Sequence, residues 1–172
     1  MSKEILSGKI VTLKMLRQDY FQSYHDMLSP VIRETIGISK EQTFEETEKF
    51  LKKKLIEIVN NTILFYCIFD NKDNDLIGSM EIREPGFFNG QLGCWIHENY
   101  WGGGRYQEAL DLLLQEYFEC TDQFVVNAYI KKKNIRSLKA HEKYGFKIIR
   151  EFEKDGTDFC EIIYKYQDVS EK

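Results

Sequence analysis

Several features that mark particular classes of protein are missing from this sequence. No apolar run approaches the roughly 18 residues of a transmembrane helix, and nothing before the first predicted strand resembles a signal peptide. The four cysteines, Cys67, Cys94, Cys120 and Cys160, form no C-x-x-C pair, and the three histidines lie far apart. These absences argue against a membrane protein, a disulfide scaffold and a structural metal site. We therefore expect a reduced, cytoplasmic protein that binds no metal.

An excess of basic residues is also lacking. The chain has 24 Lys and Arg against 28 Asp and Glu, which gives a net charge of −4. This charge argues against nucleic-acid binding and slightly favours a cationic small partner. With 42% apolar residues among 172, and no linker or low-complexity segment, the sequence predicts one domain over residues 1–172.

The hydrophobic pattern predicts a mixed α/β fold. Strands are predicted at residues 8–14, 62–69, 76–83, 91–96, 124–130, 147–152 and 159–166. Helices are predicted at residues 17–28, 44–59, 104–119 and 135–144, while 31–43 show no clear period. Ser29-Pro30 is interpreted as the end of the first helix, and Thr43 with Glu46 as a capping box for the second. Asn134 is a candidate cap for the last helix.

The most informative stretch is residues 92–110. A short apolar run over 92–96 predicts a buried strand, and apolar side chains from Tyr106 onward recur with a helical period. Between them lie three consecutive glycines, Gly102 to Gly104. A glycine run alone is more typical of a flexible loop or a helix stop. Placed between a strand and a helix, it instead predicts a phosphate-binding loop at a helix N-terminus.

At these motifs the chain resembles the GNAT superfamily of acyl-CoA-dependent N-acyltransferases. It is similar to the branch that acetylates the N-termini of ribosomal proteins. The resemblance covers nearly the whole chain and is carried by residues 93–96 with 98–104, 134–137 with 142–146, and 155–159 with Tyr164. It implies a mostly antiparallel, seven-stranded sheet flanked by about four helices. It also implies acetyl-CoA as the co-substrate.

The resemblance can be carried onto individual residues. The family's phosphate loop reads Arg/Gln-x-x-Gly-x-Gly/Ala and corresponds here to residues 101–106, while the backbone at Cys94 to Ile96 would pair with the pantetheine arm as an added strand. The cofactor-binding residues so implied are Cys94, Trp95, Ile96, Trp101, Gly102, Gly103, Gly104, Arg105, Tyr106, Gln107 and Asn134.

Two loop positions depart from the family pattern. Tyr106 stands where a small residue is usual, and Gln107 where Thr or Ser is usual. The tyrosine side chain either crowds the pyrophosphate or points into the core. These departures support an alternative function, an acyl-CoA-binding regulatory module with little transferase activity.

Acetyl transfer needs a base for the amine and a proton for the leaving thiolate. His141 aligns with the tyrosine that often protonates the thiolate, and its alternative role is packing. Family members often carry a carboxylate where this chain has Gln91, so Glu81 on the neighbouring strand is the first candidate base. A solvated surface charge is the alternative for Glu81, and Glu84 or a water chain could take the role instead.

The resemblance implies an amine acceptor that attacks the thioester directly. We expect a primary amine, either a peptide N-terminus or a small amine, and a protein that is a monomer or homodimer. An α-amine loses its proton more easily than a lysine side chain, which slightly favours the peptide N-terminus. The residues expected to border the acceptor are Glu81, Glu84, Phe87, Phe88, Trp95, His97 and Glu98.

Overall fold

The computed structural model describes residues 2–84 and 90–166 and contains one eight-stranded sheet. Its order is β1-β2-β3-β4-β5-β6-β8-β7, and all neighbours are antiparallel except β5 and β6, which are parallel. The strands are β1 (Ile5–Ser7), β2 (Val11–Met15), β3 (Ile63–Asp70), β4 (Leu76–Arg83), β5 (Gly90–Ile96), β6 (Val125–Lys131), β7 (Lys147–Lys154) and β8 (Thr157–Lys165).

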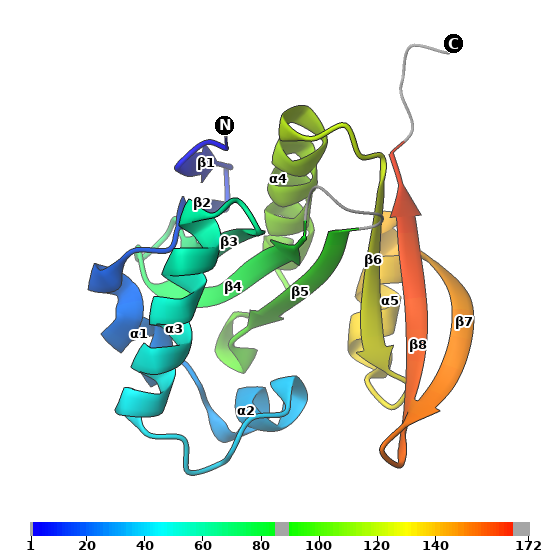
Figure 1. Ribbon diagram of the computed structural model, residues 1–172, viewed down its shortest axis with the longest axis horizontal. Coiled ribbons are helices and arrows are strands. Elements are labelled where there is room, and N and C mark those ends of the chain that lie inside the picture. The colour runs from blue at the N-terminus through cyan, green and yellow to red at the C-terminus, as the bar shows by residue number, and fades with distance from the viewer. Residues whose placement is uncertain (1, 85–89, 167–172) are drawn as a thin grey trace.

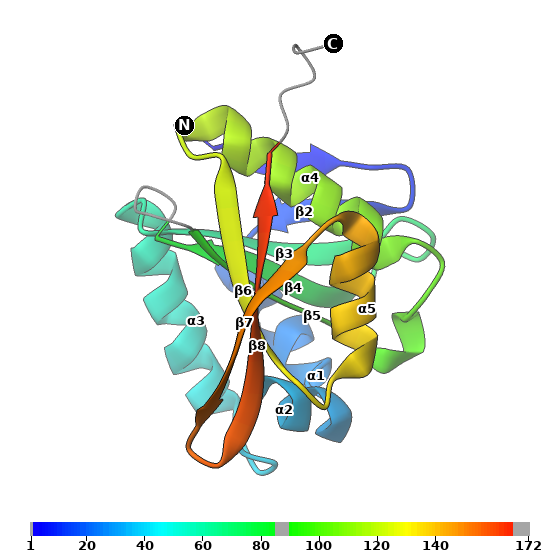
Figure 2. The ribbon, with the colours of Figure 1, turned by 90° about the vertical axis from the view of Figure 1, so that its right-hand side faces the viewer.

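Helices cover both faces of this sheet (Figures 1 and 2). They are α1 (Phe21–Asp26), α2 (Pro30–Ile36), α3 (Phe44–Val59), α4 (Arg105–Cys120) and α5 (Ile135–Tyr144), with short 3₁₀ turns η1 (Gln18–Tyr20) and η2 (Glu98–Tyr100). In Figure 2, α3 and α4 lie on opposite sides of β3 and β4. No helix among the described residues is long and apolar enough to cross a membrane.

The side chains of β3 point alternately to the two faces of the sheet and so belong to two separate core clusters. Leu64, Tyr66 and Ile68 join the cluster packed under α4, whereas Phe65 and Cys67 join the cluster under α1 and α3. Successive side chains of a strand point to opposite faces, so a strand buried on both sides reads as one apolar run. This explains why all eight residues of β3 are buried.

The structure confirms the mixed fold and corrects its element count. Within the part of the chain that the structure describes, the seven predicted strands and the long helices are present, but β1 is an eighth strand and the α-helices number five. Residues 8–10, predicted as strand, form a turn in which Gly8 N–H donates to Val11 C=O at 2.9 Å. The predicted capping box at Thr43 and the Asn134 cap are confirmed.

The end of the first predicted helix is also corrected. Residues 17–28 contain η1 and the short α1, which ends at Asp26. Ser29 and Pro30 do not stop a helix but start α2: the Ser29 hydroxyl accepts from Ile32 N–H at 3.2 Å, and Pro30 takes the first helical position. Proline suits that position because its missing N–H would have no partner there.

Candidate active site

The candidate site lies where strands β5 and β6 of the sheet separate. β5 and β6 pair in parallel only at Gly90 with Val126 and Gln91 with Asn127, and beyond these residues the two strands diverge. The divergence is visible in Figure 1 between the centre and the right of the molecule. The strand predicted to hold the pantetheine arm therefore has one free edge along most of its length.

The hydrogen-bond register shows which backbone groups face that free edge. His97 N–H donates to Ile77 C=O at 2.8 Å, so alternate β5 residues, among them Trp95, bond to β4. The N–H and C=O of Cys94 and Ile96 consequently point toward β6. Ile96 C=O accepts from the Trp101 indole at 2.7 Å, and Cys94 lies beyond the last β5–β6 pair. The Cys94 backbone is thus placed to pair with an extended ligand.

The three glycines form the turn from η2 into α4. Gly102, Gly103 and Gly104 all have left-handed φ angles of 85°, 64° and 78°, which side chains other than glycine rarely adopt. The first N–H groups of a helix lack partners within the helix. Successive N–H groups in such a turn form a concave anion site, strengthened by the positive end of the α4 dipole.

A cavity of about 350 Å³ lies over this loop. It is lined by Cys94, Trp95, Ile96, Trp101, Gly102, Gly103, Gly104, Tyr106, Gln107 and Asn134, and also by Arg136, Ser137 and Lys143. The Arg136 guanidinium carbon lies 3.3 Å from the centroid of the Trp101 ring. The sequence analysis missed the two cations, although Arg136 lies inside the motif that begins at Asn134.

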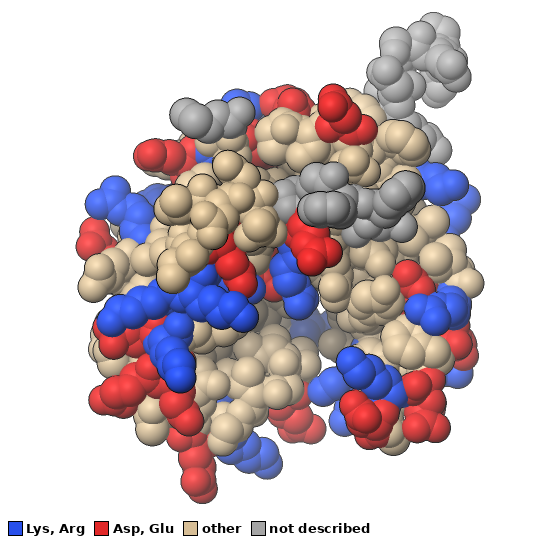
Figure 3. Space-filling model, viewed as in Figure 1, with Lys and Arg blue, Asp and Glu red and all other residues tan. Residues whose placement is uncertain are grey.

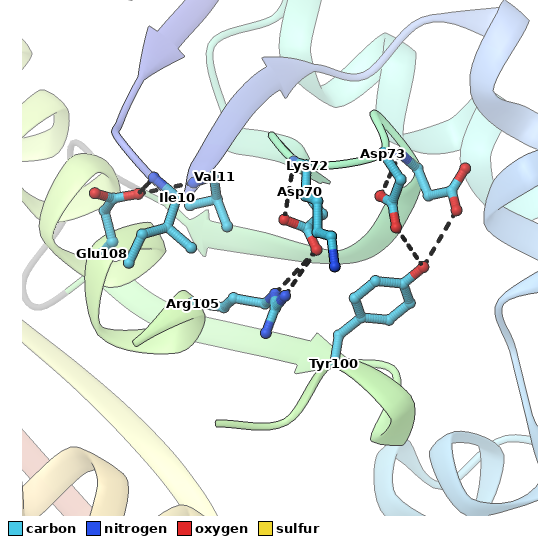
Figure 4. A network of polar contacts seen from close by, with 9 residues as sticks. Ile10, Val11, Asp70, Lys72, Asp73, Tyr100, Arg105 and Glu108 are labelled. Carbon is cyan, nitrogen blue, oxygen red and sulfur yellow. Dashed lines mark hydrogen bonds and ion pairs between the residues drawn. The ribbon is translucent and has the colours of Figure 1, made fainter. Parts of the chain in front are cut away.

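Two predicted cofactor residues are tied to other parts of the fold. The Arg105 side chain turns away from the cavity and donates to Asp70 Oδ2 from Nε and Nη2, at 3.1 and 2.9 Å (Figure 4). Its guanidinium still lies beside Gly103, since a methyl group added there would meet Arg105 Nη1 at 2.9 Å, but the residue does not line the cavity. Gln107 lines the cavity and donates from Nε2 to Ala140 C=O at 2.9 Å, which links α4 to α5.

A second cavity of about 530 Å³ adjoins the first on the α3 side of the sheet. Thr35, Cys94, Trp95, Asn134 and Ser137 line both cavities, so the two spaces meet between β5 and the start of α5. A ligand arm in the smaller cavity and a second molecule in the larger one would therefore come together near Cys94.

A chain of hydrogen bonds runs beneath this meeting point. Cys94 Sγ donates to the Tyr106 hydroxyl at 3.7 Å, and the hydroxyl lies 2.5 Å from His141 Nε2. His141 Nδ1 lies 2.7 Å from Ser137 C=O, which can only accept, so the proton is on Nδ1 and Nε2 accepts from Tyr106. Burial lowers the pKa of His141 to about 4 and raises that of Tyr106 well above its usual value.

This arrangement bears on the two alternatives for Tyr106 and on the role predicted for His141. Tyr106 packs against the core between Cys94 and His141 and does not fill the anion loop. His141 is neutral near pH 7, and both of its nitrogens already have partners. Its one N–H, on Nδ1, is bonded to Ser137 C=O, so this geometry favours the alternative packing role over donation to a leaving thiolate.

Glu81 lines the larger cavity, but it is not a free carboxylate. Its Oε1 lies 3.0 Å from Arg83 Nε and its Oε2 lies 3.5 Å from Lys54 Nζ. The solvated alternative does not hold either, because the side chain is only 15% exposed. Two cations thus hold Glu81 against β4.

The other residues expected near the acceptor are dispersed. Trp95 lines both cavities and its indole donates to the Tyr24 hydroxyl at 3.2 Å. Glu84, His97 and Glu98 line neither cavity, and His97 caps η2 instead. Phe87 and Phe88 lie outside the described residues. Within residues 2–84 and 90–166, no cluster of three His, Cys, Asp or Glu side chains suits a metal ion.

Comparison with protein families identifies the architecture. Residues 11–147 match the family described as the acetyltransferase (GNAT) domain. The chain belongs to the GNAT acetyltransferase family. Its activity is acetyl-CoA-dependent acyl transfer to an amine, as the resemblance implied, rather than binding alone. A comparison with curated protein sequences finds no significant match.

Solved GNAT structures share the fold at low sequence identity. An acetyltransferase from Salmonella typhimurium that modifies the N-terminal serine of ribosomal protein L7/L12 superposes with a TM-score of 0.82, at 16% identity, over 95% of this chain and 100% of that one. Spermidine N-acetyltransferase from Vibrio cholerae, solved with CoA and spermine, gives 0.77 at 17% identity, over 92% and 96%. At these identities the likeness shows the fold alone.

The residues present suit acetyl-CoA, which the family uses. The glycine loop offers backbone N–H groups to a pyrophosphate, and Arg136 and Lys143 add positive charge to the same cavity. The free edge at Cys94 suits the amide groups of a pantetheine arm, because those groups can pair like a strand.

Proposed function

We propose that this GNAT acetyltransferase acetylates an α-amine at a peptide N-terminus, in a complex that holds acetyl-CoA and the acceptor together. The observation that carries the proposal is the junction of the two cavities at Cys94, Trp95, Asn134 and Ser137. Acetyl-CoA in the smaller cavity would present its thioester at this junction, and the amine would approach from the larger one.

Direct attack by the amine is favoured because the nearest thiol is a poor nucleophile. Burial raises the pKa of Cys94 to about 11, so the thiol stays protonated at neutral pH. A route through an acetylated cysteine would need the thiolate. We therefore infer that the amine attacks the thioester without a covalent enzyme intermediate.

Backbone groups of β5 support the developing charge. The Cys94 N–H points into the opening between β5 and β6, where a thioester carbonyl oxygen would lie in this arrangement. A fixed N–H in a site that excludes water stabilises negative charge as it develops on that oxygen.

Proton transfers are proposed to rely on the acceptor and on Ser137. An α-amine has a pKa of about 8, so a useful fraction is uncharged at neutral pH without a strong base, whereas a lysine side chain at about 10.4 is almost fully charged. An acceptor that needs no strong base agrees with the finding that Glu81, the candidate base, is held in ion pairs. The proton that the amine loses on attack passes to the departing CoA thiolate, which leaves as the thiol. Ser137 lines the junction, and its hydroxyl can donate a hydrogen bond to the sulfur as negative charge develops there.

We also infer a cytoplasmic location, a monomer or homodimer, and no nucleic-acid or membrane partner, from the composition. The four cysteines are all free, which suits a reducing compartment.

The proposal is tested by steady-state kinetics with three acceptors. These are a short peptide, the same peptide with a blocked N-terminus and an internal lysine, and spermidine, each at pH 7 and pH 9. We expect the free N-terminus to give the highest kcat/KM at pH 7 and the lysine peptide to gain more at pH 9. Double-reciprocal plots should intersect. A preference at pH 7 for the blocked peptide or spermidine would overturn the choice of acceptor, and parallel lines would overturn direct attack.

A further inference from the structure

The larger cavity differs in charge from the molecule as a whole. Of its lining residues, Glu81, Arg83 and Lys131 are charged at neutral pH, and His141 is neutral. In Figure 3, which views this side of the molecule, the surface is hollowed near the centre, and both basic and acidic side chains border the hollow. The lining has a net charge of +1, whereas the whole chain has −4.

The single acidic residue of this lining is already neutralised. Glu81 contacts Arg83 at 3.0 Å and Lys54 at 3.5 Å, and Lys54 in turn contacts Glu57 at 3.0 Å. These four side chains balance as two acids and two bases. The Arg83 guanidinium uses its Nε toward Glu81, so its terminal nitrogens keep donors for another acceptor.

Lys131 supplies the uncompensated charge. It stands at the end of β6, and its Nζ donates to the backbone C=O of Glu34 at 3.3 Å. Across residues 2–84 and 90–166, no carboxylate lies within ion-pair distance of its Nζ.

We propose that the larger cavity selects acceptors that carry a carboxylate near the reacting amine, with Arg83 and Lys131 as the residues that bind it. This proposal rests on the acetyl transfer to an amine proposed above and specifies the acceptor class. Either side chain alone can give a carboxylate charge-assisted hydrogen bonds. They are alternative partners, because Arg83 pairs with Gln91 and Lys131 lies four residues beyond Asn127, the β6 partner of Gln91. A polyamine meets a lining that is already positive and finds no free carboxylate. The local charge of the cavity thus favours an anionic acceptor, whereas the net charge of the chain favours a cationic one.

The proposal is tested with peptides that share a free N-terminus and differ only at positions two and three, as Glu-Glu, Gln-Gln or Lys-Lys. We measure kcat/KM with acetyl-CoA, and dissociation constants for the same peptides against the enzyme saturated with CoA. The acidic peptide is expected to exceed the neutral one by about tenfold in both measurements, which is the scale of one charge-assisted hydrogen bond. Free glutamate and its amide, glutamine, form a second pair, which tests whether a small acidic amine suffices.

The matched variants are Arg83→Gln, Lys131→Gln and Lys133→Gln. All three remove one positive charge, but Lys133 is exposed and lines neither cavity. The first two should each reduce the preference for the acidic peptide at least threefold, and Lys133→Gln should leave it unchanged.

An equal loss of the preference for the acidic peptide in all three variants would overturn the proposal. The preference would then come from the overall electrostatic field of the protein and not from Arg83 and Lys131. No acidic preference in the native protein, or a preference for Lys-Lys, would also overturn it. The binding measurements do not depend on turnover. Selective binding without acetylation would therefore support the charge selection and count against the proposed function, whereas acetylation without selection would do the reverse.

Discussion

Hydrogen-bond direction decides what individual residues of the site can do. Ser137 C=O can only accept, so His141 must donate from Nδ1 and accept the Tyr106 proton at Nε2. The sequence predicted both His141 and Tyr106 as site residues; Tyr106 lines the smaller cavity and His141 lines the larger one. The sequence could not show that these two side chains hydrogen-bond to each other. They are 35 residues apart, and only the packing of α4 on α5 brings them together.

The first prediction concerns the pH dependence of stability. Burial lowers the pKa of His141 to about 4, against an ordinary value of about 6.5 in the unfolded chain. Between these values the unfolded state binds a proton that the folded state does not, so stability falls as the pH falls. We expect His141 to contribute a loss of about 3 kcal/mol in the free energy of unfolding between pH 7 and pH 4, measured by urea denaturation.

Carboxylates also titrate over part of this range, so variants must isolate the contribution of one histidine. His141→Asn should flatten the dependence between pH 6.5 and pH 4, whatever its absolute stability. His25→Asn, on α1 and remote from Tyr106, should keep the steep dependence of the native protein. A His141→Asn curve parallel to the native one would mean that His141 is charged in the fold.

Two elements were missed at the scale of strands and helices, for different reasons. α2 had a sequence signal, since a serine before a proline suits the start of a helix as well as the end of one. β1 had almost none, because it has three residues with a buried centre and exposed flanks. The position of β1 is fixed by residues that are distant in the sequence. Lys3 N–H donates to Glu116 at 2.7 Å, and the Tyr66 hydroxyl donates to Lys3 C=O at 2.6 Å.

A second prediction concerns the tie between the β1–β2 turn and α4. Glu108, in the first turn of α4, accepts from the N–H groups of Ile10 and Val11 at 2.6 and 2.8 Å (Figure 4) and from that of Lys9 at 2.9 Å. Glu108→Gln replaces one oxygen of this carboxylate by a donor and removes its charge. Hydrogen bonds to charged groups contribute about 1.5–3 kcal/mol, so we expect a loss of about 2–3 kcal/mol in the free energy of unfolding by urea.

Glu119→Gln is the control on the same helix. Glu119 is half exposed and contacts only flexible side chains, Lys3 among them, so its replacement should change stability little. If both variants were equally stable, Glu108 would not be holding the turn against α4.

At the scale of the molecule, the candidate active site depends on the separation of β5 and β6 within the sheet. Residues 92–96 were correctly predicted as a strand, and the role of the glycine turn after them as an anion site stays a prediction. Their pattern is that of any buried strand, however, and it does not show that β5 and β6 separate after two pairs. Both cavities and the free edge at Cys94 follow from that separation. Sequence reasoning therefore pointed to the glycine loop as a candidate cofactor site but not to the charge of the larger cavity, which depends on α3, β4 and β6 together.

The last prediction is that acetyl-CoA stabilises the whole chain through the glycine loop. Ligand at one hundred times its dissociation constant adds about 2.7 kcal/mol to the free energy of unfolding. For a chain of this size that corresponds to a rise in Tm of about 5–10 °C. Gly102→Ala should reduce this rise, because a methyl group at a φ of 85° strains the turn that presents the N–H groups to the ligand. Thermal melts with and without millimolar acetyl-CoA measure both effects.

Gly156→Ala is a control with almost the same backbone. Gly156 has a φ of 75° in the β7–β8 turn and, like Gly102, has no atom within 4 Å of an added methyl group. Both variants should therefore lose about 1–2 kcal/mol through left-handed strain alone. Only Gly102→Ala should also lose the response to acetyl-CoA, since Gly156 lines neither cavity. Equal responses in the two variants would separate the glycine turn from cofactor binding, and no response in the folded native protein would contradict the site itself.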